Sequence, residues 1–73
     1  MKTIKIAKVP GVVREVVVDD TAKLGDALDV YATSFGEEVA NYEMRVGDTT
    51  VSRDYIPADG AKIYLVLMIK GNL

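Results

Sequence analysis

The chain has 73 residues, of which 49% are hydrophobic and 27% charged, with a formal net charge of −2. This length suits a single domain over residues 1–73 with a small core, because such a chain buries only about 60% of its unfolded surface. Cysteine and histidine are both absent, which excludes a disulfide framework and an ordinary zinc site, and the net negative charge disfavours nucleic-acid binding. We therefore expect no metal, no cofactor and no nucleic-acid partner.

Apolar residues occur in short runs. The first nine residues carry three lysines among single apolar residues, which is unlike a secretion signal. The longest apolar run, Ile63 to Ile69, has seven residues, whereas a helix that crosses a bilayer needs about 20. We expect a soluble cytoplasmic protein that binds no membrane.

Charge is distributed unevenly along the chain. Residues 1–14 hold four basic and no acidic side chains, and residues 15–48 hold nine acidic and two basic ones. Opposite charges could face each other within one small fold, or a bipolar surface could orient a charged partner during encounter. Both interpretations remain open at this point.

The N-terminal segment predicts two strands joined by a turn. In Lys2 to Val9, Ile4 and Ile6 alternate with other residues, which is the period of a half-buried strand. Pro10-Gly11 indicates a turn. Val12 to Val18 is rich in β-branched residues, which favour strands. The two segments together predict a hairpin.

A short helix is predicted next. Asp20 or Thr21 is expected to cap its N-terminus, since their side-chain oxygens can accept hydrogen bonds from free helical amides. Gly36 is expected to close it in the left-handed conformation. An apolar stripe at helical spacing is formed by Leu24, Ala27, Leu28 and Tyr31. Asp26 and Asp29 fall on the opposite side, toward water.

Three strands are predicted in the second half. Tyr42 to Val46 alternates, and Gly47-Asp48 forms a turn into a short strand around Thr50 and Val51. Ala61 to Lys70 is the strongest strand: Ile63, Leu65, Leu67 and Ile69 share one face, and Tyr64, Val66 and Met68 share the other. A strand that is apolar on both faces is usually central.

The order hairpin, helix, strand, short strand, strand predicts an α+β fold. One helix can cover one face of a four- or five-stranded mixed sheet, giving a two-layer core. A right-handed crossover places the last strand in the middle, beside the first. This arrangement is the β-grasp, or ubiquitin-like, fold.

The second half also carries two motif-like stretches. From residue 42 onward the sequence resembles the small sulfur-carrier proteins of thiamine and molybdopterin biosynthesis, the ThiS and MoaD type. The stretch Arg45-Val46-Gly47-Asp48-Thr49-Thr50-Val51 is similar to their V-N-G-x-x-V turn, and Tyr55-Ile56-Pro57-Ala58-Asp59-Gly60 to their x-L-x-D-G-D loop. Upstream, the resemblance is one of pattern only.

That resemblance draws attention to the C-terminal tail. Family members act through a C-terminal Gly-Gly, whose carboxylate a partner adenylates before it accepts sulfur as a thiocarboxylate. Glycine suits a narrow active site because it lets backbones approach closely. Here Gly71 matches the first glycine, Asn72 replaces the second and Leu73 is an addition. The departure falls on the feature that carries the chemistry.

The sequence favours a protein that is not an enzyme. Without His or Cys, the usual nucleophile–base pairs are absent. Paired carboxylates could still perform acid–base work. The pairs are Asp19/Asp20, Asp26/Asp29, Glu37/Glu38 and Asp54/Asp59, and capping, solvation, loop polarity and turn formation account for them. No catalytic residue is therefore predicted.

What remains is the outer face of the sheet. If Ile63, Leu65 and Leu67 face the helix, then Tyr64, Val66 and Met68 face outward, and Val17 and Ala7 could join them. Exposed apolar area containing Tyr and Met is typical of protein contact sites.

These features lead to one main hypothesis and two alternatives. The leading one is a non-catalytic ubiquitin-like module that binds a protein partner, or itself, through this face and the C-terminal strand. One alternative is a sulfur-carrier or protein-modifier precursor that acts through a tail processed at Gly71. The other is a small accessory subunit of a larger enzyme.

Overall fold

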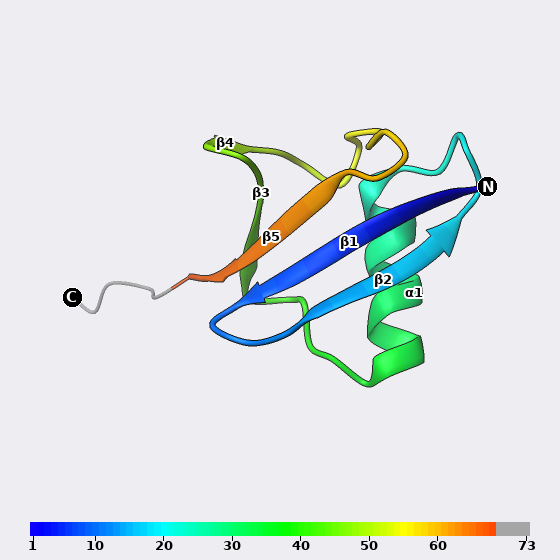
Figure 1. Cartoon of the computed structure of the whole chain (residues 1–73). Coiled ribbons are helices and arrows are strands. Elements are labelled where there is room, and N and C mark those ends of the chain that lie inside the picture. The colour runs from blue at the N-terminus through cyan, green and yellow to red at the C-terminus, as the bar shows by residue number, and fades with distance from the viewer. Residues whose placement is uncertain (69–73) are drawn as a thin grey trace.

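The computed structural model describes residues 1–68; the expectations that fall on Ile69 to Leu73, including the tail at Gly71, Asn72 and Leu73, lie outside the described residues. Five strands and one helix make up the described part (Figure 1). In chain order they are β1 (Lys2–Val9), β2 (Val13–Val18), α1 (Leu24–Phe35), β3 (Tyr42–Val46), β4 (Thr49–Thr50) and β5 (Lys62–Leu67).

The five strands form one mixed sheet in the order β2-β1-β5-β3-β4. β5 runs parallel to β1, and the other pairs are antiparallel. The last strand thus lies in the middle beside the first, as its two apolar faces predicted. Figure 1 shows α1 lying behind the sheet on one side. The predicted β-grasp arrangement is confirmed.

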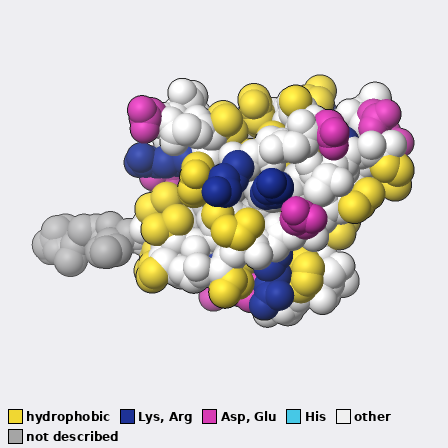
Figure 2. Space-filling model, in the orientation of Figure 1, with side chains coloured by type: hydrophobic (Ala, Val, Ile, Leu, Met, Phe, Trp, Pro, Cys, Tyr) yellow, Lys and Arg dark blue, Asp and Glu magenta, His cyan; other side chains and the backbone are white. Residues whose placement is uncertain are grey.

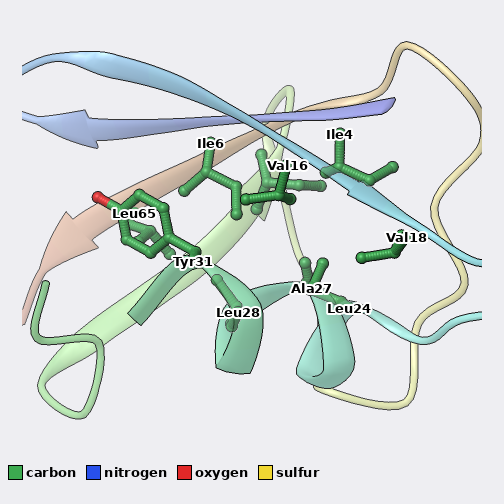
Figure 3. Packing of buried hydrophobic residues seen from close by; sticks show 10 residues of the cluster. Ile4, Ile6, Val16, Val18, Leu24, Ala27, Leu28, Tyr31 and Leu65 are labelled. Atoms are coloured by element: carbon green, nitrogen blue, oxygen red, sulfur yellow. The ribbon is translucent and has the colours of Figure 1, made fainter. Parts of the chain in front are cut away.

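The core lies between the helix and the inner face of the sheet. Figure 3 shows side chains from both layers meeting there. The buried apolar cluster comprises Ile4, Ile6, Val16, Val18, Leu24, Ala27, Leu28, Tyr31, Ile63 and Leu65. The apolar stripe predicted for the helix is therefore confirmed. β1, β2 and β5 each contribute alternate residues to the buried cluster, because successive side chains point to opposite faces.

The predicted N-cap was wrong. The helix begins at Leu24 with Lys23 in the N-cap position, and neither Asp20 nor Thr21 fills that role. Instead, the Asp19 carboxylate accepts hydrogen bonds from the Thr21 amide at 3.2 Å and hydroxyl at 2.6 Å. The residues expected to cap the helix thus belong to a turn ahead of it, which side chains of this kind also favour.

Distant backbone satisfies the first helical amides. The Leu24 amide donates to the Tyr55 carbonyl at 2.6 Å, and the Gly25 amide donates to the Arg53 carbonyl at 2.9 Å. This long-range contact replaces a local side-chain cap. A Cβ at Gly25 would lie 3.1 Å from the Arg53 Cβ, so the glycine lets the loop approach closely. At the other end, Gly36 adopts the predicted left-handed conformation.

The basic N-terminal segment meets acidic residues within the fold. Lys8 Nζ lies 2.8 Å from Glu37 Oε1, and Arg14 Nε lies 3.9 Å from Glu37 Oε2. The terminal amine lies 3.0 Å from Asp20. These contacts support the interpretation that opposite charges face each other inside the molecule. In the part of the chain that is described, no helix is long and apolar enough to cross a membrane.

Candidate protein-interaction surface

Strand registers decide which β5 side chains face away from the helix. Ile63 and Leu65 are fully buried on the inner face, so Tyr64 and Val66 between them point outward. On the same face, Tyr64 lies between Ala7 of β1 and Arg45 of β3. The predicted outward direction of Tyr64 and Val66 is therefore what the structure shows.

The neighbouring row extends this apolar surface. Val66 lies between Val9 of β1 and Glu43 of β3. Met68 follows at the same parity, and its amide donates to the Asn41 carbonyl at 3.0 Å, which continues the pairing with the β3 side. Met68 is thus held beside the sheet with 45% of its surface exposed.

Six residues form what we call the outer-face patch. Figure 2 looks onto this side of the sheet and shows hydrophobic side chains interspersed with basic ones. Val9 and Val13 are 43% and 52% exposed, whereas Tyr64 and Val66 are half-buried by their neighbours. The members are Val9, Val13, Tyr64, Val66, Met68 and Ala7, of which Ala7 is itself buried at 5% exposure. Because α1 covers the opposite face, the described residues leave this patch open.

A shallow hollow of about 370 Å³ lies within the patch. Val9, Tyr64 and Val66 form its apolar wall, and Arg45 and Asp48 supply opposite charges at its border. The hollow therefore offers an apolar recess with a charged group of each sign beside it, an arrangement that can receive one apolar side chain and orient it.

Arg45, one of the two charged residues beside the hollow, is held by a hydrogen bond to Glu43, which Thr50 holds in turn. Arg45 Nη2 donates to Glu43 Oε1 at 3.2 Å, and the Thr50 hydroxyl donates to Glu43 Oε2 at 2.7 Å. These two bonds, the one from Thr50 first, lower the pKa of Glu43 below its ordinary value. On the other side, Lys62 Nζ lies 5.6 Å from the centre of the Tyr64 ring, within the range of a cation–π contact.

Val17 does not join the patch, although it lies on the same face. It pairs with Thr3, whereas Ala7 pairs with Val13. The row of Glu15 and Lys5 separates the two positions. Val13 therefore takes the place expected for Val17, and sequence reasoning missed it. Counting outward from the Pro10-Gly11 turn would have set Ala7 opposite Arg14, because the observed pairs are centred on Pro10 and not between the two turn residues.

The acidic pairs considered for catalysis contain residues in structural contacts. Asp19 bonds to Thr21, the Asp26 carboxylate accepts from the Lys23 amide at 3.2 Å, and Asp59 accepts from the Thr3 amide at 2.8 Å. Glu37 pairs with Lys8. Within residues 1–68 no group of three or more acidic, Cys or His side chains is arranged to hold a metal ion.

No family model and no curated protein matches this sequence. Solved structures do match its fold. The ubiquitin of Caldiarchaeum subterraneum superposes with a TM-score of 0.72 at 18% identity, covering 97% of this chain and 98% of that chain. Small archaeal modifier protein 1 of Haloferax volcanii superposes with a TM-score of 0.76 at 16% identity, covering 94% of this chain and 100% of that chain.

A third match extends the comparison to a larger protein. A chain in the crystal structure of ATBAG1 in complex with HSP70 gives a TM-score of 0.73 at 15% identity, covering 92% of this chain and 40% of that chain. At such low identities the likeness concerns the fold. The protein therefore has the ubiquitin-like β-grasp fold, as predicted.

Proposed function

We propose that this protein is a non-catalytic ubiquitin-like module that binds a folded protein partner through the outer-face patch. The observation that carries the proposal is an apolar strip, with a partly apolar hollow beside Tyr64, on a sheet face that α1 does not cover. Contiguous exposed apolar area of this kind marks protein contact sites. We propose the cytoplasm as the place of binding, as the sequence led us to expect.

The chemistry of the patch suggests what the partner presents. Tyr64, Val66 and Met68 would contact apolar side chains of the partner, because Tyr and Met are enriched at protein interfaces. Arg45 and Asp48 border the hollow and would select a partner with complementary charges at its rim. In support, one match of similar fold comes from a complex, ATBAG1 with HSP70.

The double variant Val66→Glu with Met68→Glu tests the proposal. It places two carboxylates in the patch and should reduce capture of the partner, by cross-linking in the native cell, at least about tenfold. The matched control is Thr33→Glu, which adds a carboxylate on the exposed side of α1. Equal capture by the double variant and the control, with both folded by circular dichroism, contradicts the proposal.

A second candidate is a carrier or modifier precursor that acts through a tail processed at Gly71. It is supported by the likeness in fold to small archaeal modifier protein 1 over 94% of this chain. Mass spectrometry of the protein from its native cell tests it. A chain ending at Gly71 as an adenylate or thiocarboxylate supports this candidate, and an intact Leu73 terminus contradicts it. If the captured partner is an enzyme that co-purifies at fixed stoichiometry, the protein is an accessory subunit.

A further inference from the structure

The β2 strand is an edge of the sheet in the described part of the chain. The Lys8 amide donates to the Val12 carbonyl at 3.2 Å, and hydrogen-bonded pairs recur at every second residue of an antiparallel ladder. Even-numbered residues of β2 therefore bond to β1. The backbone groups that point away from β1 belong to Val13, Glu15 and Val17.

The two edges of the sheet differ in their capacity to pair further. β4 has only two residues, which is one way in which proteins blunt an edge. β2 has six residues, four of them valine, and lacks proline. A long β-branched edge is a template for another strand. Further pairing is therefore favoured at β2.

A second hollow, of about 400 Å³, lies beside this edge, between β2 and α1. Val17, Val18 and Val30 line it with apolar surface, and Asp19 and Asp26 line it with carboxylates. Val17 and Val30 are 56% and 39% exposed. The hollow therefore suits an extended chain that carries a basic side chain.

We propose that this edge binds a second copy of the same chain, by antiparallel pairing of β2 with β2 about a two-fold axis at Val16. The residue that fits the acidic hollow is Arg14, which lies on β2 itself. In the pair, Arg14 of each copy lies opposite Val18 of the other and reaches the carboxylates of Asp19 and Asp26. Two sheets of five strands then become one continuous sheet.

Charge selects the axis at Val16 among the four interior residues of β2, Arg14 to Val17. An axis at Val13 or Val18, at either end of the strand, would pair only part of β2. The backbone groups that point out of one β2 edge must face those that point out of the other, so odd-numbered residues must pair with odd-numbered residues. The two-fold axis therefore passes through a residue and not between two neighbouring residues. An axis at Arg14 or at Glu15 would set like charges directly opposite each other, and an axis at Val17 would set Glu15 opposite Asp19. Directly opposed like charges destabilise strand pairs. The axis at Val16 sets Glu15 opposite Val17.

The state of Arg14 in the monomer supports this role. Its Nε is buried without a hydrogen-bond partner among the described residues and lies 3.9 Å from the Glu37 carboxylate. Its guanidinium carbon lies 4.7 Å from the centre of the Phe35 ring. A buried donor without an acceptor is costly. Contact with the other copy's Asp26 would give the guanidinium a second carboxylate besides that of Glu37.

The dimer uses a different surface from the proposed function. A two-fold axis perpendicular to the sheet keeps the same face of both copies on the same side, so two outer-face patches point in one direction. The contact is a pair of strand edges and one hollow from each copy, which is a small interface. Interfaces below about 1,200 Å² are typically weak, so we expect a dissociation constant in the micromolar range.

Sedimentation equilibrium of the purified protein between about 5 and 500 μM measures the dimer. Arg14→Glu and Asp26→Lys should each raise the dissociation constant at least about tenfold, because each sets like charges against the hollow. An equimolar mixture of the two variants should restore dimerisation, because both contacts then join opposite charges. Val66→Glu, outside this interface, should dimerise as the unaltered protein does.

Amide hydrogen exchange gives a second readout in the unaltered protein. Exchange at Glu15 and Val17 should slow as the concentration rises, since their amides gain acceptors across the interface. A monomer at every concentration overturns the proposal. So does a dimer that Val66→Glu abolishes, or a failure of the mixed variants to associate while each remains folded. The Val66→Glu arm also separates this dimer from partner binding at the outer-face patch.

Discussion

The two faces of the sheet differ in how strongly packing restricts their side chains. On the inner face Ile4, Ile63 and Leu65 are fully buried against the helix. On the outer face Tyr64 and Val66, one residue away along the same strand, are only half-buried. Packing density constrains the first face, because buried volume must be filled. The second face leaves its side chains partly open to solvent.

The largest expected effect comes from truncating adjacent residues of β5. Leu65→Ala should lower the free energy of unfolding by about 3 kcal/mol, because it leaves a cavity in the core. Val66→Ala should lower it by less than about 1 kcal/mol, since its surroundings are already open to solvent. Urea denaturation followed by circular dichroism measures both. Equal losses would remove the distinction between the faces.

A polar residue on the inner face gives the next effect. Lys2 is only 4% exposed, and its Nζ donates to the Ala22 carbonyl at 2.9 Å and to the Pro57 carbonyl at 2.6 Å. Lys2→Ala removes both bonds and the packed stem of the side chain. Unfolding should become easier by about 2 kcal/mol. Lys5→Ala, on the outer face of the same strand, is the control.

An unchanged unfolding free energy in Lys2→Ala would show that this end of the inner face tolerates change as the outer face does. Lys5 is exposed, so its truncation should alter stability by no more than about 0.5 kcal/mol. A larger loss in Lys5→Ala than in Lys2→Ala would reverse the expected order of the two faces.

The smallest effect concerns pH at the other end of the inner face. The hydrogen bond from Lys8 lowers the pKa of Glu37 below its ordinary value of 4.5, and the same bond raises the pKa of Lys8 above 10.5. The contribution of Glu37 to the free energy of unfolding is therefore present above pH 4.5, and it is lost as the pH falls through the lowered pKa. The Lys8 contribution is present below pH 10.5 and is lost as pH rises through the raised pKa.

Glu37→Gln tests this pair. The variant should have a lower urea midpoint at pH 7, and its stability should fall less steeply than that of the unaltered protein below pH 4.5. Glu38→Gln serves as the matched control, because Glu38 is exposed and bonds only to Asn41 among the described residues. If the urea midpoints of Glu37→Gln and the unaltered protein depended on pH in the same way below pH 4.5, the stabilising role of the Lys8–Glu37 pair would be contradicted.

Much of the fold was predictable because its signals are local. Alternation in β5 separated Ile63 and Leu65 from Tyr64 and Val66, and two apolar faces placed the strand in the middle of the sheet. The helical stripe that includes Leu28 and Tyr31 named the residues that are buried. These patterns depend on the fixed periods of strand and helix, which neighbours in space do not alter.

The candidate surface was predictable only in part. Tyr64 and Val66 follow from parity within one strand, whereas choosing Val13 and not Val17 as their neighbour required knowing how β1 pairs with β2. The start of the helix was misplaced for a similar reason. The amides of Leu24 and Gly25 bond to the carbonyls of Tyr55 and Arg53 respectively, about thirty residues away. No local pattern reports such a contact.

The sequence by itself determined which side of each element is apolar, since side-chain direction follows from backbone geometry over a few residues. Only the tertiary structure decided that Lys2 is enclosed, that Val13 joins Tyr64, and that β2 lies at an edge beside an acidic hollow. Those outcomes depend on strand order and register. Strand order and register are both fixed by contacts between segments that lie far apart in the chain. The free energy of the whole core selects the arrangement, and no single segment does so by itself.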